Sequence, residues 1–152
     1  MHYRGLDHIG FTVTSLDRSI PFYTMLLGEE PMGRLAWNPE TDEFVGRIIG
    51  YRGLELGGAF WRLPSGTILE LLEYRHPPSG HVDMETYNVG NGHLGLLTDD
   101  IRADFERLRT HVEFRNSEPV RIPSGPAQGG YAIYLRDPDG ITIELVQAPP
   151  SA

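Results

Sequence analysis

Two histidine–glutamate pairs recur along the chain at matched positions. The segments GTILELLEY and GITIELVQA place Glu70 and Glu144 74 positions apart, and their opening glycines have the same separation. The segments DHIGFTVTSLDRSIPFY and GHLGLLTDDIRADFERL place His8 and His93 85 positions apart. Two imidazoles and two carboxylates form an N₂O₂ donor set, which suits a divalent ion such as Zn, Ni, Co, Fe or Mn with water completing the coordination. The matched spacing predicts two copies of one supersecondary unit that together hold a metal ion.

The glutamate of the second copy lies in an otherwise apolar strand. Side chains alternate between the two faces of a strand, so Ile141, Ile143 and Leu145 share one face, which can pack on a helix. Glu144 then points to the opposite face. A carboxylate that faces an enclosed space is costly unless a partner meets it. The turn DPDG before this strand is expected to need positive φ at its glycine.

The alternative interpretation is structural, with each histidine–glutamate pair serving only to hold the fold together. Taken singly, such residues are more often structural than ligands. Because all four recur at equivalent, inward-facing positions, we favour the metal site. Tyr134 fits both a cavity-lining residue and a core aromatic, and Glu73 is placed on the helix-packed face or strand edge, outside the site. The remaining histidines lie at a terminus, in a linker or at a helix end and are expected to be solvated: His2, His76, His81 and His111.

Hydrophobic periodicity predicts a β-α-β-β-β order for each copy. The expected elements of the first copy are a strand over 6–13, a helix from Ser15 or Asp17 to about 27, and strands over 32–37, 55–63 and 67–74, with a short helix over 44–49. Those of the second are a strand from 93, a helix from Asp99 or Asp100 to about 111, and strands over 120–122, 131–135 and 141–146. The prediction is an α+β protein with modules at 1–75 and 92–152, a linker at 76–91, and one structural domain in total. Each module leaves one sheet face uncovered, so two modules must pair to bury it.

Composition excludes several classes of function. The chain has 152 residues and a formal net charge of −8, without a basic cluster, so neither nucleic acid nor an anionic membrane is an expected partner. It has no cysteine, which excludes disulfides, thiolate metal sites and cysteine nucleophiles and suits a cytoplasmic location. No apolar run approaches the length of a membrane span, and the N-terminus does not have the pattern of a signal peptide.

The chain resembles the vicinal oxygen chelate superfamily, which includes glyoxalase I, methylmalonyl-CoA epimerase, extradiol dioxygenases and bleomycin resistance proteins. The resemblance is carried by DHIGFTVTSLDRSIPFY, GTILELLEY, GHLGLLTDDI and YLRDPDGITIELV. It implies paired βαβββ modules in an open, incompletely closed eight-stranded barrel around a metal. It also implies that His8, Glu70, His93 and Glu144 are the metal ligands.

The first functional hypothesis is a metal-dependent isomerase, epimerase or lyase that chelates two vicinal oxygens of a small-molecule substrate. A glutamate would then move a proton on the adjacent carbon, with Glu144 the first choice and Glu70 the second. Glutamate at position 70 looks like the glyoxalase pattern, whereas the epimerases typically carry glutamine there. They also carry a His-His pair where this chain has Gly92 and His93. The sequence does not indicate glutathione or CoA specificity.

The second hypothesis is an extradiol ring-cleavage dioxygenase, which needs a redox-capable ion on two histidines and one carboxylate. Part of that family's final motif is present as Tyr134, Asp137-Pro138, Gly140 and Glu144, but the histidine expected shortly before the tyrosine is missing from the segment 127–130.

The third hypothesis is an antibiotic-binding resistance protein without catalysis. Four intact ligand positions argue against it.

We also expect a homodimer, because small paired sheets leave edges and apolar surface that a symmetric partner can cover. Whether the modules pair within one chain or swap across the dimer is left open.

Gly10 and Gly95 follow the two histidines on the same strand faces. They are expected to leave space for substrate, the alternative being close sheet packing.

Overall fold

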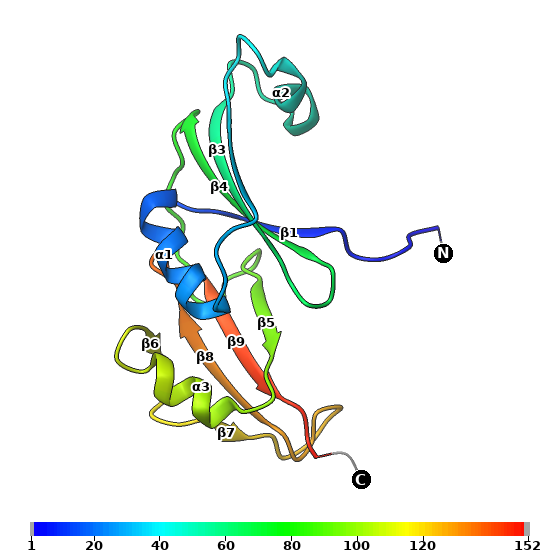
Figure 1. Cartoon of the computed structure of the whole chain (residues 1–152), viewed down its shortest axis with the longest axis vertical. Coiled ribbons are helices and arrows are strands. Elements are labelled where there is room, and N and C mark those ends of the chain that lie inside the picture. Colours follow the sequence, from blue (N-terminus) through cyan, green and yellow to red (C-terminus); the bar gives the residue numbers. More distant parts are fainter. Residues whose placement is uncertain (1, 151–152) are drawn as a thin grey trace. The chain divides into compact units, whose positions relative to one another are not determined.

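The computed structural model describes residues 2–150 of the chain. The chain divides between His81 and Val82 into two compact units, here called unit 1 and unit 2, each built on its own sheet (Figure 1). The boundary falls inside the predicted linker 76–91. The outermost residues of the predicted modules, Met1 and residues 151–152, lie outside the described part of the chain.

Unit 1 is a four-stranded sheet with two helices. Its elements are β1 (His8–Thr12), α1 (Leu16–Leu27), β2 (Gly33–Trp37), α2 (Glu43–Ile49), β3 (Glu55–Arg62) and β4 (Ile68–His76). The strand order is β1-β4-β3-β2, with β1 parallel to β4 and the other pairs antiparallel. All six elements were predicted, including the short helix α2.

Unit 2 repeats this plan with one helix among its described residues. Its elements are β5 (His93–Leu97), α3 (Ile101–Leu108), β6 (Glu113–Phe114), β7 (Val120–Arg121), β8 (Tyr131–Arg136) and β9 (Thr142–Gln147). The strand order is β5-β9-β8-β6, and β7 also pairs with β8. The sequence did not predict β6, because a two-residue strand is created by its pairing with β8 rather than by its own pattern. The α+β fold class is confirmed.

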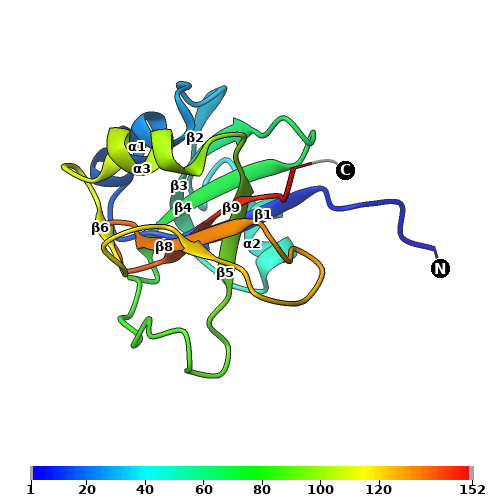
Figure 2. The ribbon, with the colours of Figure 1, turned by 90° about the horizontal axis from the view of Figure 1, so that it is seen from below.

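Apolar stripes on the helices pack against the sheets, as the periodicity predicts. In unit 1, Tyr23 of α1 and Leu71 of β4 are completely buried. In unit 2, α3 packs against β9 on one face of the sheet (Figures 1 and 2), and Ile101, Leu108 and Ile143 are completely buried. The opposite face of each sheet carries the histidine and the glutamate of that unit.

The last strand of each unit also caps the helix of that unit. The Glu73 carboxylate accepts a hydrogen bond of 2.7 Å from the Leu16 backbone N–H, the first of α1. The Gln147 side chain accepts one of 3.1 Å from the Ile101 N–H, the first of α3. The two helix starts are 85 positions apart and the two capping residues 74 apart, so the repeat extends to the caps. Glu73 is therefore a capping residue outside the metal-ligand set.

The turn before β9 is held by one buried carboxylate. Asp137 is 5% exposed, and its Oδ1 accepts hydrogen bonds of 2.8 Å from the backbone N–H groups of Asp139 and Ile141. Gly140 adopts φ of 83°, the positive value that the sequence predicts. Pro21 lies inside α1, as its sixth residue. None of the helices in residues 2–150 has both the length and the apolar character needed to cross a bilayer.

Candidate metal centre

In unit 1, β1 and β4 bring His8 and Glu70 to the same face of the sheet. The parallel register places Gly10 opposite Glu70. His8 Nε2 lies 4.0 Å from Glu70 Oε2, and the Glu70 side chain is 21% exposed. The predicted pairing of these two residues is therefore present in the fold.

The other ring nitrogen of His8 has a carboxylate partner. His8 Nδ1 lies 2.8 Å from Asp7 Oδ1. This hydrogen bond is the main cause that raises the pKa of the His8 imidazole; burial lowers that pKa and the nearby Glu70 raises it. An Nδ1–H that donates to Asp7 leaves the Nε2 lone pair directed at Glu70. Sequence reasoning missed Asp7, although its position directly before His8 was the available signal.

Unit 2 repeats the pair in the same register. β5 and β9 place Gly95 opposite Glu144, as Gly10 stands opposite Glu70. His93 Nε2 lies 3.2 Å from Glu144 Oε2. No aspartate stands before His93, where the chain has Gly92. The two pairs thus share backbone placement and differ in what orients the imidazole.

An aromatic ring supports His93 instead. Tyr134 pairs with Glu144 across β8 and β9, and its ring centroid lies 5.3 Å from that of His93. Its hydroxyl is 3.4 Å from His93 Nε2. Burial, and to a smaller degree the Glu144 carboxylate, raise the pKa of the Tyr134 phenol. The equivalent position opposite Glu70 in unit 1 is Phe60, so the hydroxyl is a feature of unit 2. Of the two interpretations of Tyr134, the structure supports the one that places it beside the site.

The donor separation in unit 2 is the one that two ligands of a divalent ion would have. Metal–nitrogen and metal–oxygen bonds of about 2.1 Å place neighbouring ligand atoms roughly 3.0–3.4 Å apart for octahedral and tetrahedral angles. The 3.2 Å separation in unit 2 lies in this range, whereas the 4.0 Å separation in unit 1 exceeds it. Within the described residues of either unit, no group of three histidine, aspartate or glutamate side chains is arranged to hold an ion. Each unit thus brings together one histidine and one glutamate, a pair that is here called its half-site.

A family model for the Glyoxalase/Bleomycin resistance protein/Dioxygenase superfamily matches residues 5–145. The match spans both units and includes all four residues of the half-sites. The chain belongs to this superfamily. The family recognised from the four sequence segments is thereby confirmed.

The relatives include enzymes of two kinds. A lactoylglutathione lyase of Salmonella typhimurium is 33% identical over 147 residues, covering 94% of this chain and 92% of the relative. A 2-epi-5-epi-valiolone epimerase of an Actinomyces species is 29% identical over 149 residues, covering 97% and 81%. Glyoxalase-like lyases and epimerases are thus this chain's relatives within the superfamily.

Solved structures support the same fold. A glyoxalase family protein of Bacillus cereus superposes with a TM-score of 0.75 at 24% identity, covering 99% of both chains. The trypanothione-dependent glyoxalase I of Leishmania major superposes with a TM-score of 0.64 at 25% identity, covering 95% of this chain and 87% of that one. These glyoxalase-family structures share the mixed α+β fold.

The glycines opposite the two glutamates have different surroundings. A Cβ built on Gly10 would lie 3.0 Å from Glu70 Oε2, so a side chain there would press on the carboxylate. A Cβ built on Gly95 meets no atom within 4 Å. The predicted free space thus exists beside Glu144, whereas Gly10 makes room for the rotamer of Glu70.

The remaining histidines and the hollows of the surface lie outside the half-sites. His2, His76, His81 and His111 are all exposed, as predicted. A hollow of about 700 Å³ lies beside α2 and is lined by residues that include Arg47 and Tyr51. Neither His8 nor Glu70 lines it.

Proposed function

We propose that the protein is a divalent-metal-dependent enzyme of the glyoxalase type that transfers a proton on a carbon next to oxygen-bearing groups of a small substrate. The observation that carries this proposal is the repetition of one His–Glu half-site in identical strand register in both units. A single such pair has a structural explanation. Two equivalent pairs would together offer an N₂O₂ donor set, which suits a divalent ion.

The complete centre needs both half-sites. His8 and Glu70 would provide two donors, and His93 and Glu144 the other two, either within one chain or across a dimer. The two sheets would then face each other as an open barrel with the ion between them. The donor set accepts Zn, Ni, Co, Fe or Mn, with the remaining positions left for substrate oxygens.

The bound ion would supply Lewis-acid polarisation of a substrate carbonyl. The protein's own contribution starts with Glu144, whose half-buried carboxylate can accept the proton from the adjacent carbon and return it. Tyr134 lies against the neighbouring imidazole, and its hydroxyl can donate a hydrogen bond to a substrate oxygen. The open space at Gly95 leaves room for the substrate beside Glu144. Glu70 is the alternative proton acceptor on the opposite half-site.

Names of relatives support this class of reaction. The matched proteins include a lactoylglutathione lyase and an epimerase. Ring cleavage is less well supported, because the segment 127–130 lacks the histidine that the dioxygenases carry shortly before the tyrosine.

The test uses the full chain loaded with Ni, Co or Zn under anaerobic conditions. We expect it to exchange the acidic C–H of a 2-oxo-acid derivative, a thioester or a hemithioacetal with solvent deuterium. Glu144→Gln should reduce this exchange by about 100-fold or more while retaining part of the metal affinity, since an amide oxygen can ligate but cannot take up the proton. His93→Ala should lower metal occupancy, and His111→Ala serves as the control. Oxygen consumption by the Fe(II)-loaded protein with a catechol, without exchange on any of these carbonyl compounds, would replace this proposal with the dioxygenase.

A further inference from the structure

The segment 82–91, directly before β5, exposes apolar side chains and partly buries polar ones. Val82, Tyr87 and Val89 are 67%, 79% and 105% exposed. Glu85 and Asn91, in contrast, are partly buried. The segment carries no helix or strand of its own, so polar contacts rather than apolar burial set its conformation.

Hydrogen bonds inside the segment close it on itself. Asn91 Nδ2 donates to the backbone carbonyls of Asp83 and Glu85 at 2.8 and 2.9 Å. Asn88 Nδ2 donates to the same Asp83 carbonyl at 3.2 Å, and Asp83 Oδ1 accepts from the Glu85 N–H at 3.0 Å. The last of these bonds is the main cause that lowers the pKa of Asp83. Asn91 thus joins the end of the segment to its beginning.

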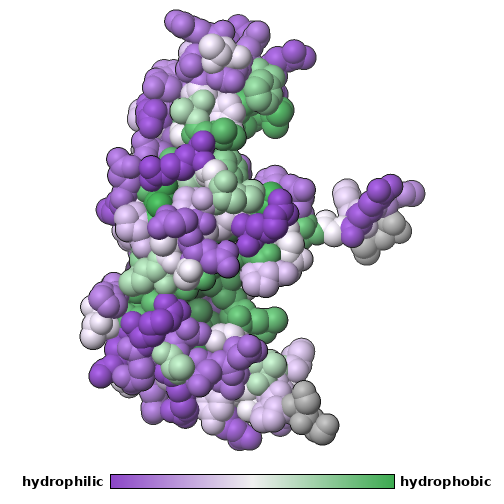
Figure 3. All heavy atoms as spheres, viewed as in Figure 1, coloured by the Kyte–Doolittle hydropathy of each residue, from purple (hydrophilic) through white to green (hydrophobic). Residues whose placement is uncertain are grey.

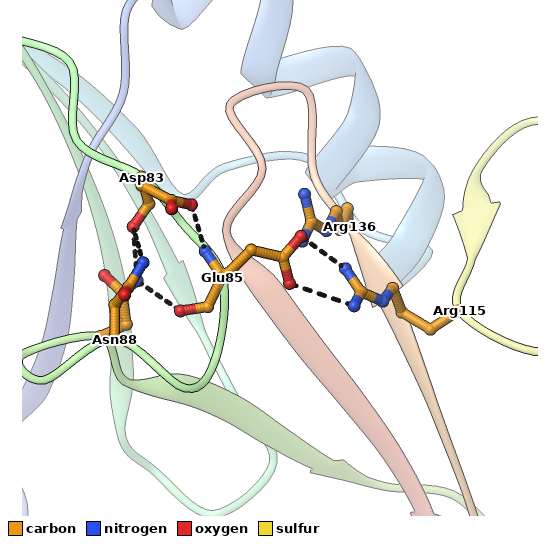
Figure 4. Close-up of polar contacts among 6 residues, drawn as sticks. Asp83, Glu85, Asn88, Arg115 and Arg136 are labelled. Carbon is orange, nitrogen blue, oxygen red and sulfur yellow. Dashed lines mark hydrogen bonds and ion pairs between the residues drawn. The ribbon is translucent and has the colours of Figure 1, made fainter.

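A second set of contacts anchors the closed segment to the sheet of unit 2. Figure 4 shows the Glu85 carboxylate between two guanidinium groups. Arg115 donates to both carboxylate oxygens at 3.3 and 3.1 Å, and Arg136 donates to Oε1. Arg115 follows β6, and its backbone N–H bonds to the Tyr134 carbonyl at 2.8 Å. Arg136 ends β8 opposite Thr142, which itself stands opposite His93 in the sheet.

This anchoring affects His93 because of the position of that residue in the sheet. His93 is the first residue of β5, and β5 is an edge strand that pairs with β9 alone among the described strands. The first residue of a short edge strand is prone to local opening, because few contacts restrain it. Asn91 is separated from His93 by Gly92 alone. Fixing Asn91 therefore restrains the backbone from which the imidazole reaches Glu144 and Tyr134.

We propose that segment 82–91 is a clasp that positions His93, with Asn91 and Glu85 as its positioning residues. The clasp acts on the backbone next to His93, whereas Asp7 contacts the ring of His8 directly. This inference rests on the proposed function in so far as His93 is a metal ligand; the restraint on the His93 backbone and ring stands independently of the metal.

The test compares isosteric asparagine-to-aspartate changes in the full chain. Asn91→Asp keeps the size of the side chain but removes both N–H donors, and we expect the Ni or Co affinity by titration calorimetry to fall about 10-fold or more, as for other outer partners of ligating histidines. Asn88→Asp removes one longer hydrogen bond and should have a smaller effect. Asn116→Asp is the matched control, because it adds the same charge to unit 2 and Asn116 only accepts a hydrogen bond, from Ser117. It should leave the affinity unchanged.

A metal-free measurement separates positioning from general stability. In the metal-free protein, NMR contacts between the His93 and Tyr134 rings should be weakened in Asn91→Asp and preserved in Asn116→Asp, with the amides of β8 and β9 still protected from exchange. Glu85→Gln should weaken the contacts between the same two rings. These contacts should be stronger in Glu85→Asp, which keeps a carboxylate, than in Glu85→Gln. This second series keeps the test open should Asn91→Asp fail to fold.

The outcomes distinguish the two proposals. Loss of ring contacts together with loss of affinity supports the clasp and the metal site. Loss of ring contacts while His93→Ala leaves metal affinity unchanged supports the clasp and contradicts the proposed metal site. Normal ring contacts and normal affinity in both Asn91→Asp and Glu85→Gln overturn the clasp.

Discussion

At the scale of single residues, the two imidazoles of the half-sites are held by different means. Asp7 accepts from His8 Nδ1, whereas the His93 ring lies tilted against the ring of Tyr134. A carboxylate on the outer ring nitrogen fixes the tautomer and raises the basicity of the ligating nitrogen. The unit 1 half-site is therefore tuned by a charge and the unit 2 half-site by packing.

The Asp7 contact leads to the first prediction. Asp7→Ala should lower metal affinity about 10-fold, because His8 loses the acceptor that keeps its proton on Nδ1. Asp7→Asn retains an acceptor oxygen and should lie between Asp7→Ala and wild type. Calorimetric titration with Ni measures the affinity, and ¹⁵N NMR of the metal-free protein reports the His8 tautomer. Asp99→Ala, which removes an exposed carboxylate elsewhere, is the control. An unchanged tautomer and affinity in Asp7→Ala would contradict this role.

At the scale of elements, the start of each helix depends on a side chain from the last strand of its unit. In α1 the N-cap residue Ser15 makes no side-chain hydrogen bond to the helix, so Glu73 supplies the acceptor. In α3 the Asp100 side chain accepts from Arg102 and Ala103, and Gln147 adds to it. The two capping side chains lie at equivalent positions, but α1 depends more on Glu73 than α3 depends on Gln147.

This inequality leads to the second prediction. Glu73→Ala should destabilise the protein by about 1–2 kcal/mol, because a partly buried N–H at the start of α1 loses its acceptor. Gln147→Ala should cost less, since Asp100 continues to cap α3. Urea unfolding measures both, and Glu73→Gln, which keeps an acceptor oxygen, is the control. A larger loss for Gln147→Ala than for Glu73→Ala would show that the caps are ranked wrongly.

The clasp of unit 2 makes stability depend on acid pH, which is the third prediction. Hydrogen bonds from Arg115 and Arg136 lower the pKa of Glu85 in the folded protein. A carboxylate whose pKa is lowered by folding stabilises the fold above its unfolded pKa of about 4.3, and this contribution disappears as pH falls through the lower folded value. Wild type should therefore exceed Glu85→Gln in stability at pH 7, and the difference should shrink below about pH 4.

Denaturant midpoints of both proteins at several pH values test this dependence. Other carboxylates titrate in the same range, so the informative quantity is the difference between wild type and variant. A difference that stays constant from pH 7 to pH 3 would mean that the Glu85 charge does not support the clasp.

At the scale of the whole molecule, unit 1 exposes large apolar side chains on β2 and around α2, and Figure 3 shows apolar surface near α2. They are Leu35, Phe44, Ile48 and Tyr51, each more than half exposed. Surface of this kind is typical of an association site. The homodimer expected from the sequence stays a prediction, and these side chains are where we expect a second copy to pack.

The fourth prediction concerns this association. Light scattering at micromolar concentration should give twice the chain mass of 17.1 kDa. Ile48→Asp should shift the mass to that of the monomer, because Ile48 is 78% exposed and its replacement leaves the core intact. Leu6→Asp, at an exposed residue before β1, should leave the mass unchanged. A wild-type mass of one chain would contradict the dimer.

The sequence by itself determined the repeat, the order of the long elements and the two residue pairs. Strand alternation sets which face Glu144 occupies, and the constant offsets between the copies set equivalent positions for His8 and His93. These are properties of local periodicity, which is readable without a fold. The same reasoning failed for β6, whose two residues become a strand through pairing with β8.

Only the tertiary structure decided how these residues are supported. Glu73 reaches the start of α1 across 57 positions of sequence, and Glu85 reaches Arg136 across 51. Neither contact has a local pattern, because each depends on a side-chain direction and on a distant partner brought near by the sheet. For the same reason the segment 82–91, whose composition indicates only turns, is found to be closed by Asn91 and anchored to the strands that carry the second half-site.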